Sequence, residues 1–568
     1  MRRDLHSLSR SSYDVAVVGG GIHGICALHE AARRGLSACL IERGDFVGAT
    51  SSNSLKTIHG GLRYLQHADF GRMRESIRER ARLLRIAPHL VRPLAFVLPT
   101  RGHGLHSKPV MRAALLLNDV IGFDRSAGVI PGRVIPRGRV IGRAEIAALV
   151  PGLDVARGEL TGGAVWYDCQ VSNTERLAFA YLHSAVAAGG ACANYVEATG
   201  LLLKDGRVLG VKAKDALGGD RFEIRARAVV NAAGPWVDCL LRELPAASAT
   251  RRFHTSKAFN LVTRRLHASH AVGFRVPTAF SDSDALLNKG DRLFFVVPWK
   301  QFSLIGTRHL PYRGDPDQFA VTEADVELFL AEINAACPAA GLTRADVVAV
   351  LGGMLPETPR ARSGEVQLVK HSSIHDHSAD GAQGLFSVVG VKWTTARATG
   401  AKALDAVEAQ LRPGAERRRA PEAPLYGGEI EDLERFFQLE EAQRPASVSP
   451  ASMRHLLENY GTTAREVLAY IRRDPELGRE LGERSPVIAA EAVFAVEHEM
   501  AQRLSDVVQR RTELSVGGHP GRQALGRCAE LMGSHLAWGR QRCEAEVDRA
   551  DAALRGPVTF TPVERNRL

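Results

Sequence analysis

A short apolar run, a glycine-rich turn and a small-residue helix follow one another near the start of this chain. Val15 to Val18 are apolar, three glycines follow in the spacing GxGxxG, and the next residues read ICALHEAARRG. A second apolar run then ends in Glu42, 18 residues after the last glycine, Gly24. This order of strand, turn, helix and acid is typical of a dinucleotide-binding βαβ unit. The sequence therefore predicts a Rossmann-like unit over residues 13 to 42.

Each part of this unit has a physical task. Gly19 and Gly21 allow a tight turn and let a pyrophosphate approach the helix N-terminus, whose amides and dipole favour anions. Glu42 is placed to accept hydrogen bonds from a ribose. A chance glycine-rich turn would explain the glycines, but not the strand, helix and acid in the same register. The unit alone does not distinguish NAD from FAD.

The stretch after Glu42 favours a flavin. Residues 50 to 67 read TSSNSLKTIHGGLRYLQH, with hydroxyl side chains at the start and His59, Arg63 and His67 around a glycine pair. Glycine costs backbone entropy, so a glycine pair indicates that something approaches the chain closely. The hydroxyl groups can donate to a diphosphate, and the glycine pair would let a flat ring lie against the backbone. These residues are Thr50, Ser51, Ser52, Gly60 and Gly61.

Length and composition indicate an ordinary globular protein of two or three domains. The chain has 568 residues, which is too long for one core. Of these residues 45% are hydrophobic and 24% are charged, as in ordinary soluble proteins. The formal net charge of +11 suits an anionic substrate, a nucleic acid or an anionic membrane, and equally a solvated arginine-rich surface. Because no aromatic-basic motif is present, we expect no nucleic-acid partner.

The cysteines and the N-terminus bear on the compartment. Eight cysteines are scattered without metal-type spacing, which predicts reduced thiols and a cytoplasmic location. No apolar run reaches the ~18 residues that span a bilayer. Arg2 and Arg3 before an apolar segment resemble an export signal, but Asp14 interrupts the segment and no clean cleavage site follows. We therefore expect a chain that is not exported.

The strand and helix patterns change along the chain. Residues 195 to 230 alternate in short strand-like runs, 291 to 307 contain two more, and 322 to 336 have the pattern of a helix. A Pro-, Arg- and Glu-rich stretch at 412 to 424 is typical of a linker. Beyond it the chain looks helical, and an apolar stripe over 493 to 508 indicates core packing rather than a cofactor site.

Several longer stretches resemble one family. VVGGGIHG and IERGDFVGATSSNSLKTIHGGLRYLQ are similar to segments of the flavin-dependent glycerol-3-phosphate dehydrogenases, in the D-amino-acid-oxidase-like flavoprotein class. The similarity covers roughly residues 12 to 535. It continues through YDCQVSNTERLAFAYLHSAVAAGG, VVNAAGPWVD, VVPWKQFSLIGT, VVGVKWTTAR and EAVFAVEHEMAQRLSDVVQRRTELSV. The pattern TSSxSxKxIHGGLRYL is highly specific to that family.

The resemblance implies an α/β fold in three parts. An FAD-binding Rossmann-like domain is interleaved with an antiparallel-sheet substrate domain over residues 12–411. The substrate sheet is expected mainly in about 85–165 and 240–350. The linker at 412–424 then leads to a helical domain over 425–555.

The resemblance also implies which residues bind FAD. The position of Val196 meets the adenine through its backbone, and the segment from Gly390 to Thr394 reaches both the flavin and the substrate pocket. In chain order the implied FAD residues are Gly19, Gly21, Gly24, Glu42, Arg43, Thr50, Ser51, Ser52, Gly60, Gly61, Leu62, Val196, Ala233, Gly234, Gly390, Lys392 and Thr394.

For the substrate, the resemblance implies His59, Arg63 and Lys392 as catalytic residues, with Arg63, Tyr64 and Lys257 binding the substrate. Oxidation of an alcohol by a flavin needs a base for the hydroxyl proton and cations for an anionic group, which a histidine and an arginine can supply. Without the resemblance, the residues alone favour a structural role for His59 and Arg63. The remaining histidines are expected to be structural or at the surface, so no metal site is predicted; they are His23, His67 and those within 371 to 377.

Three departures from the family pattern concern the substrate phosphate. The family carries an arginine in a Gly-x-Arg-Pro-like segment, where this chain has Met354 or Leu355, and a second family arginine appears here as Lys370. The segment GTRH adds Arg308 and has His309 in place of an acid. Losing one bidentate arginine weakens phosphate binding about 10- to 100-fold unless another cation replaces it. We expect a less anionic substrate, or compensation by Arg308, Arg360 or Arg362.

The expected function is FAD-dependent oxidation of a small secondary alcohol, most simply sn-glycerol 3-phosphate to dihydroxyacetone phosphate, with electrons passed to quinone or another acceptor. Two alternatives stay open: an FAD enzyme for another small hydroxy or amino acid, and a flavoprotein subunit that has lost catalysis. The family works at the bilayer surface, so we also expect peripheral contact with the inner face of the membrane. The basic helix expected at 72 to 90 is a candidate for this contact, although an ordinary helix with a solvated side explains it equally. A homodimer is a further expectation.

Overall fold

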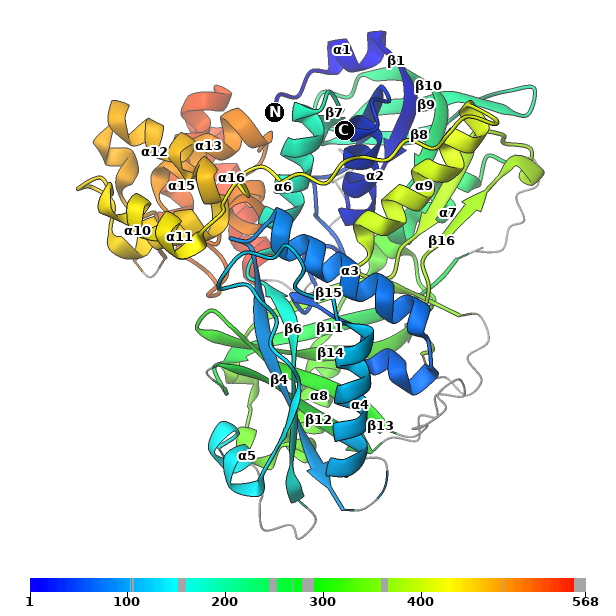
Figure 1. The fold of residues 1–568 in the computed structure, drawn as a ribbon. Helices are drawn as coiled ribbons and strands as arrows, with labels where there is room; N and C mark the ends of the chain where they lie inside the picture. Colours follow the sequence, from blue (N-terminus) through cyan, green and yellow to red (C-terminus); the bar gives the residue numbers. More distant parts are fainter. Residues whose placement is uncertain are drawn as a thin grey trace.

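The structure, a computed structural model, describes residues 1–102, 104, 107–151, 160–244, 253–267, 269–277, 291–358, 366–483 and 485–555. For Arg63, Gln66, Asp291 and Arg292 it describes the backbone alone. Figure 1 shows an upper lobe built on one sheet, a lower lobe built on another, and a group of C-terminal helices beside the upper lobe. The predicted fold class, a Rossmann-like α/β unit with an antiparallel sheet and C-terminal helices, is confirmed.

The upper lobe is a mainly parallel sheet with β1 (Ser12–Val18) near its centre. β1 pairs in parallel with β2 (Ala38–Ile41) and β10 (Arg221–Asn231), and β7 (Ala191–Ala193) and β17 (Leu385–Val389) extend the parallel order outward. The central strands are buried almost continuously rather than at alternate positions, because both faces of the sheet are covered. This is the βαβ arrangement that the glycine spacing predicts.

Helices and an antiparallel ribbon complete the upper lobe. α2 (Ile22–Arg33) packs against α6 (Thr174–Ala187) and α9 (Ala396–Leu411). β10 continues into an antiparallel ribbon with β9 (Arg207–Asp215) and β8 (Val196–Lys204), which are the short runs predicted over 195 to 230. The smaller elements are α1 (Leu5–Arg10), η2 (Gly234–Trp236), α7 (Val237–Leu241), β16 (Ser373–Asp376) and η7 (Ser378–Asp380).

The lower lobe is a nine-stranded sheet. In spatial order its strands are β15 (Val347–Glu357), β11 (His254–Arg264), β14 (Phe302–Tyr312), β13 (Asp291–Trp299), β12 (His270–Pro277), β4 (Val91–Arg101), β6 (Leu160–Val171) and β3 (Thr57–Ile58), with β5 (Arg139–Ile141) paired to β6. Neighbouring strands of this sheet pair antiparallel, except β12 and β4, which are parallel. Phe259 of β11 meets Phe329 of α8 (Glu323–Ala336) edge to face, so α8 covers part of the sheet.

The basic helix α3 (Phe70–Ile86) lies between the lobes, and most of its arginines contact other residues of the protein. Arg80 pairs with the buried Asp168 of β6, and Arg74 pairs with Asp124. Arg78 is the exposed arginine of this helix. α3 therefore offers little basic surface to lipid, and the ordinary explanation fits this helix better than the membrane contact expected for residues 72 to 90.

The stretch at 412–424 contains no helix or strand. Glu422 within it pairs with Arg82 and Arg85 of α3, so the stretch is attached to the upper part of the molecule. The predicted domain boundaries stay a prediction.

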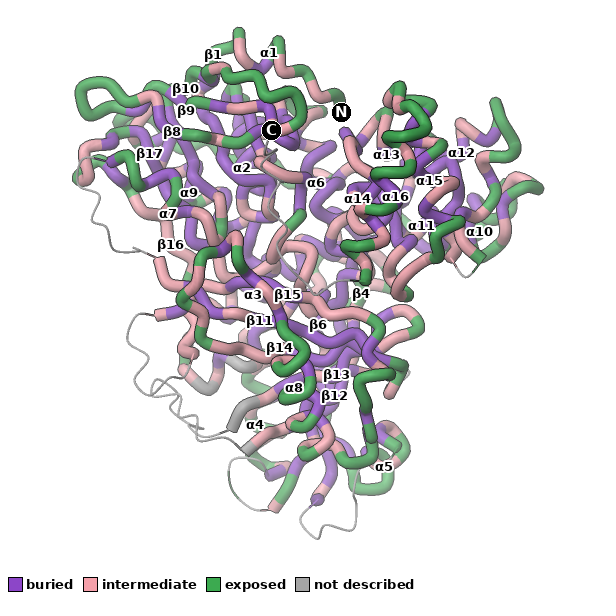
Figure 2. Tube along the Cα trace, turned by 180° about the vertical axis from the view of Figure 1, so that it is seen from behind, coloured by how far each residue is buried: buried purple, intermediate pink, exposed green. Residues whose placement is uncertain are grey.

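The apolar stripe over 493 to 508 is divided between separate helical segments. α13 (Ala489–Glu499) ends at Met500, which has a left-handed φ of 55°, and the amides of Met500 and Ala501 both close on Ala495 O. The chain resumes in α14 (Leu504–Asp506) and a π-helical turn, Val507–Arg511. Val496, Leu504, Val507 and Val508 face the core of the helical part, whereas Met500 packs into the core of the upper lobe. Figure 2 shows buried positions there and along the strands of both sheets.

The other elements are α4 (Lys108–Ile121), α5 (Arg143–Leu149), α10 (Leu433–Ala442), α11 (Pro450–Tyr460), α12 (Ala464–Arg473), α15 (Arg522–Leu536), α16 (Arg540–Arg555), and the short helices η1 (Leu62–His67), η3 (Pro316–Gln318), η4 (Pro338–Ala340), η5 (Arg344–Asp346), η8 (Gly461–Thr463) and η9 (Pro475–Gly478). Across the described part of the chain, no helix is both long and apolar enough to cross a membrane.

A buried histidine links the helical part to the lower lobe. His455 of α11 lies between two carboxylates, with Nε2 3.1 Å from Glu491 Oε2 and Nδ1 3.3 Å from Glu513 Oε2. Glu513 in turn pairs with Lys300, at the turn between β13 and β14. Although burial alone would lower the pKa of His455, Glu491 and Glu513 raise this pKa to about 9.

The raised pKa of His455 predicts that the protein loses stability in mild alkali. A folded-state pKa raised from 6.5 to about 9 stabilises the fold fully below pH 6.5, and this stabilisation is lost as the pH rises through 9. We expect the free energy of unfolding, measured by urea titration, to fall over this window in the natural protein. His455→Gln should be less stable at pH 6 and show a flatter slope across the window. Parallel slopes for the two proteins would contradict the assignment.

Candidate active site

A cavity of about 1370 Å³ is lined by residues of both lobes. It exceeds the roughly 300–1,000 Å³ of most small-ligand pockets, as an extended dinucleotide together with a substrate requires. Its walls come from the glycine turn after β1, the segment from 48 to 62, strands β11, β14 and β15, and the loop before α9. Segments far apart in the sequence therefore meet at one site.

The glycine turn leaves room for a ligand at the start of α2. Gly19 has a left-handed φ of 108°, and a Cβ there would lie 2.5 Å from Ala232 O. α2 begins at Ile22 with Gly21 as its N-cap and no acidic side chain in its first turn. Gly24 does not line the cavity; it lets α2 pack closely, since a Cβ there would collide with Gly19 O. The open helix N-terminus suits a pyrophosphate.

Glu42 is fixed beside this turn by backbone amides. Its Oε2 accepts from Gly20 N at 2.6 Å and its Oε1 from Gly44 N at 2.8 Å, and both oxygens keep lone pairs for a ribose. Burial raises the pKa of Glu42, and the two amides oppose this rise. Val196 N donates to Glu42 O at 2.7 Å, so the start of β8 lies next to this acid. Arg43 also lines the cavity, but it pairs with an aspartate, Asp317, at 2.7 Å.

The three predicted hydroxyl ligands differ in where they point. Ser51 Oγ accepts from Ile22 N at 3.0 Å, which leaves its own proton for an acceptor in the cavity. Thr50 Oγ1 accepts from Met354 N and donates to Met354 O, so it joins the segment to β15. Ser52 donates to a backbone carbonyl three residues earlier and does not line the cavity. The structure therefore does not place Ser52 at the cavity, because its hydroxyl closes a local turn.

The glycine pair makes room for protein side chains. A Cβ on Gly60 would meet the Arg80 guanidinium, and Gly60 does not line the cavity. Gly61 has a left-handed φ of 95°, and a Cβ there would lie 2.6 Å from the Tyr64 ring. The pair thus lets Arg80 and Tyr64 pack closely, and the flavin contact expected at Gly60 stays a prediction. Gly61 and Leu62 line the cavity.

His59 is held at the cavity wall by a buried carboxylate that the sequence analysis missed. Its Nδ1 lies 3.3 Å from Asp168 Oδ2, and Arg80 Nη1 lies 2.6 Å from Asp168 Oδ1. The Gly60 amide and Trp166 Nε1 also donate to Asp168. Burial alone would raise the pKa of Asp168, but His59 and Arg80 bring this pKa below its usual value. Asp168 lies in the YDCQ stretch, one of the segments that resemble the family, and this resemblance is the sequence signal that could have identified it.

The loop before α9 closes around His59. Thr394 Oγ1 accepts from His59 N at 3.1 Å. Lys392 Nζ contacts Tyr64 Oη and lies 4.2 Å from the centre of its ring. Gly390 has no room for a Cβ because His23 Nε2 lies against it, and burial lowers the pKa of His23 to about 4. His23, Tyr64, Lys392 and Thr394 all line the cavity beside His59.

The predicted phosphate-binding cations separate into three groups. Arg308 lines the cavity, and its Nη2 lies 2.9 Å from Glu332 Oε1. Lys257 is not at the cavity: it pairs with Asp325 of α8 at 2.8 Å, on the outer side of β11. The prediction that Lys257 binds substrate is therefore not supported. The side chain of Arg63, and all of Arg360 and Arg362, lie outside the described residues.

The remaining positions follow the expected pattern in part. Val196, Ala233, Gly234 and Gly390 line the cavity, as do Lys370, His309 and Met354, which mark the departures from the family. Met354 is 2% exposed and packs in the core of the lower lobe. In the part of the chain that the structure describes, no group of three metal-ligating side chains occurs.

The C-terminal helical part also reaches the cavity, which sequence reasoning did not anticipate. Arg503, Ser505 and Gln509 line it, and the Arg503 guanidinium lies 5.5 Å from the ring of Tyr195, the neighbour of Val196. Arg503 and Ser505 lie between the apolar positions of the 493–508 stripe and Gln509 follows it directly, so the apolar pattern drew attention away from them.

Comparisons with known proteins agree with this site. The family described as FAD dependent oxidoreductase matches residues 14–406, and the C-terminal domain of alpha-glycerophosphate oxidase matches residues 419–543. The glycine cradle at Gly19, the open start of α2 and the buried Glu42 fit the diphosphate and ribose of FAD.

Relatives match along nearly the whole chain. The glycerol-3-phosphate dehydrogenase of Synechocystis sp. is 33% identical over 96% of this chain and 97% of its own. Glycerol-3-phosphate dehydrogenase 2 of Mycobacterium bovis is 33% identical over 97% of this chain and 89% of its own. The X-ray structure of the glycerol-3-phosphate dehydrogenase from Bacillus halodurans complexed with FAD has a TM-score of 0.73 and 25% identity, covering 98% of this chain and 97% of that chain. This chain belongs to the FAD-dependent oxidoreductases and, among them, to the glycerol-3-phosphate dehydrogenase family.

Proposed function

We propose that this protein oxidises sn-glycerol 3-phosphate to dihydroxyacetone phosphate with bound FAD and passes the electrons to quinone or another acceptor. The observation that carries the proposal is His59, held by the buried Asp168 at the wall of the FAD cavity. The names of the full-length relatives support the choice of substrate.

The chain supplies the base that such an oxidation needs. Bound FAD supplies the hydride acceptor. We assign the proton of neutral His59 to Nδ1, because Nδ1 faces the ionised Asp168; Nε2 is then left to accept the hydroxyl proton of the substrate. Asp168 stabilises the imidazolium that this transfer creates, and Arg80 keeps Asp168 ionised.

The chain also supplies cations for the substrate phosphate. Lys392 lies beside His59, while Arg308 and Lys370 reach the same cavity from other strands and loops. Met354, where the family carries an arginine, contributes no charge. Among the described residues, Arg308 is the best replacement for the family arginine. Glu332 pairs with Nη2 of its guanidinium, whereas its Nε is buried without a hydrogen bond to described residues and can donate to a phosphate.

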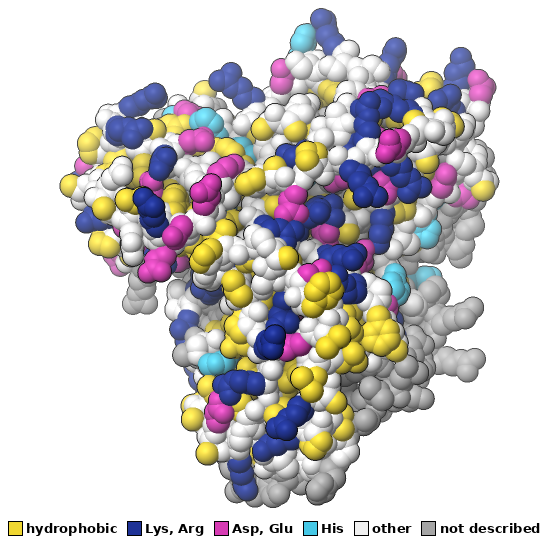
Figure 3. Space-filling view, viewed as in Figure 1, with side chains coloured by type: hydrophobic (Ala, Val, Ile, Leu, Met, Phe, Trp, Pro, Cys, Tyr) yellow, Lys and Arg dark blue, Asp and Glu magenta, His cyan; other side chains and the backbone are white. Residues whose placement is uncertain are grey.

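We place the membrane contact at α4 and not at α3. Leu116, Val120 and Phe123 are 61%, 70% and 81% exposed, on α4 and just beyond it. Figure 3 shows hydrophobic side chains gathered over the lower lobe around the position of α4. Exposed apolar side chains that cluster on a surface mark an interaction site, and a lipid acceptor such as quinone must be met at a bilayer. The cytoplasmic location and the homodimer stay predictions.

Asp168→Asn tests the role of the histidine–carboxylate pair. The substitution keeps the shape of the side chain but removes its charge, so the rate of flavin reduction by glycerol 3-phosphate should fall about 100-fold or more. Anaerobic stopped-flow absorbance at the flavin bands measures this rate, and FAD content is measured alongside. Asp124→Asn, which breaks the Arg74 pair at the other side of α3, is the control. An unchanged reduction rate in Asp168→Asn would remove His59 and Asp168 from the mechanism.

A substrate panel tests the phosphate site. With a dye acceptor, glycerol 3-phosphate should give a higher kcat/KM than glycerol, other polyol phosphates and small hydroxy acids. Arg308→Ala should raise the KM for glycerol 3-phosphate about 10- to 100-fold, whereas Arg344→Ala, which breaks a surface pair with Glu323, should not. If glycerol 3-phosphate is inert and another substrate reduces the flavin, Met354 marks a changed specificity.

Vesicle binding tests the α4 surface. At low salt the protein should sediment with vesicles that contain anionic lipid, and Leu116→Ser with Val120→Ser and Phe123→Ser should abolish this. Leu439→Ser changes a leucine of α10 that is 52% exposed and should leave binding intact. Equal sedimentation of the two variants would place the contact elsewhere.

A further inference from the structure

The loop that follows Glu42 is anchored on two sides. On the cavity side, Gly44 N donates to Glu42 and Val47 N donates to Gly20 O, so the loop is tied to the glycine turn. On the other side, the Asp45 carboxylate is buried, with 1% of its side chain exposed, and pairs with arginines of the C-terminal helical part. The partners of Asp45 therefore decide where the ribose-binding acid lies.

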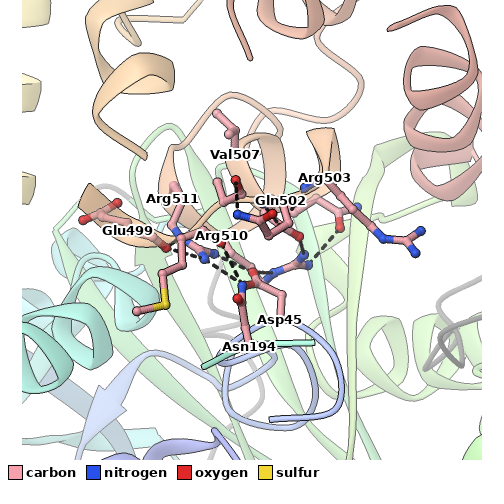
Figure 4. A network of polar contacts seen from close by, with 12 residues as sticks. Asp45, Asn194, Glu499, Gln502, Arg503, Val507, Arg510 and Arg511 are labelled. Atoms are coloured by element: carbon pink, nitrogen blue, oxygen red, sulfur yellow. Dashed lines mark hydrogen bonds and ion pairs between the residues drawn. The ribbon is translucent and has the colours of Figure 1, made fainter. Parts of the chain in front are cut away.

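Those partners come mainly from the C-terminal helical part. Arg510 Nε lies 2.5 Å from Asp45 Oδ2, and Arg511 forms a two-pronged contact with both carboxylate oxygens. Asn194, just before β8, donates to the same carboxylate at 2.9 Å. Figure 4 shows Asp45 and Asn194 meeting the two arginines at the π-helical turn. The two arginines follow one another in this turn and reach one acid together.

The charges of this cluster balance. Asp506 pairs with Arg510 at 2.6 Å and accepts from Tyr195 Oη at 2.7 Å, while Arg511 also donates to Glu499 O. Arg511 is fully buried. A buried ion pair that loses one partner leaves an uncompensated charge, so the loop after Glu42 and the π-helical turn hold each other in place.

Residues before and within this cluster also line the cavity. Arg503, Ser505, Gln509 and Arg510 line the same cavity as Glu42 and Val196. The Arg503 guanidinium lies 5.5 Å from the centre of the Tyr195 ring, next to Val196. Arg503 Nε is buried and has no hydrogen-bond partner among the described residues. Arg503 lines the same cavity as Glu42, the acid expected to bind the ribose, and its Nε can donate a hydrogen bond to the adenosine.

We propose that the C-terminal helical part is a component of the cofactor site: Asp45, Arg510 and Arg511 position the ribose-binding loop, and Arg503 and Gln509 contact the adenosine end of FAD. FAD binding and the docking of the helices then stabilise one another, because the same loop serves both. Arg510 and Arg511 are positioning residues, whereas Arg503 and Gln509 touch the cofactor.

Titration with fragments of FAD distinguishes contacts at the adenosine end from contacts at the flavin end. Flavin is removed from the full chain, and FAD, ADP and FMN are titrated by calorimetry. Arg503→Ala together with Gln509→Ala should weaken FAD and ADP by the same factor, about 10-fold, because ADP carries the adenosine end alone. FMN, which lacks that end, should bind as it does to the natural protein. Unchanged affinity for FAD and ADP, or an equal loss for FMN, would overturn the proposal.

A matched pair of variants tests the positioning role. Asp45→Asn should lower the affinity for both FAD and ADP, because the loop after Glu42 loses its anchor. Lys300→Met breaks another buried pair of the helical part, with Glu513, but touches neither the loop nor the cavity. It should lower the thermal unfolding temperature and leave ADP affinity unchanged. If the two variants lose ADP affinity equally, the ion pairs serve only to hold the helices. Should Asp45→Asn not fold, the Arg503 and Gln509 titration decides.

Discussion

The ion pair between Arg80 and Asp168 is the contact on which the geometry of the active site depends. Both side chains are nearly inaccessible to solvent, so neither charge is tolerable without the other. The pair joins α3 to β6, and the same carboxylate receives His59 and the Gly60 amide. The position of the base is therefore set by the interior of the protein and not by the loop that carries the base.

The glycine pair follows from that ion pair. Once Arg80 must reach Asp168 beside residue 60, a side chain at this position would occupy the space of the guanidinium. Gly61 in turn admits the ring of Tyr64, whose hydroxyl meets Lys392. In the sequence these glycines suggest a ligand-binding turn. In the structure they make room for Arg80 and Tyr64, which pack around the buried charge and so shape the cavity wall.

The sequence predicted what depends on local pattern and missed what depends on long-range pairing. The glycine spacing and Glu42 were enough for the βαβ unit, because a strand, a turn and a helix are encoded within 30 residues. Lys257 lies on the strand expected to border the substrate, but strand alternation and the acid of α8 turn its charge away from the cavity. Asp168 lies about 110 positions from His59, and Arg503 lies about 310 positions from Tyr195, which it contacts; one sequence carries no signal for such pairs.

The cavity wall also sets an order of events during synthesis of the chain. Among the described residues its lining runs from Val18 to Ala553, so 535 positions separate its first and last parts. At about 5–20 residues per second, a ribosome needs about 25 to 100 s to make that interval. Throughout this time the glycine turn is exposed without the walls that complete it. The flavin thus meets its whole site only when the polypeptide is almost finished, which makes cofactor capture a late step of maturation and leaves incomplete chains without their prosthetic group.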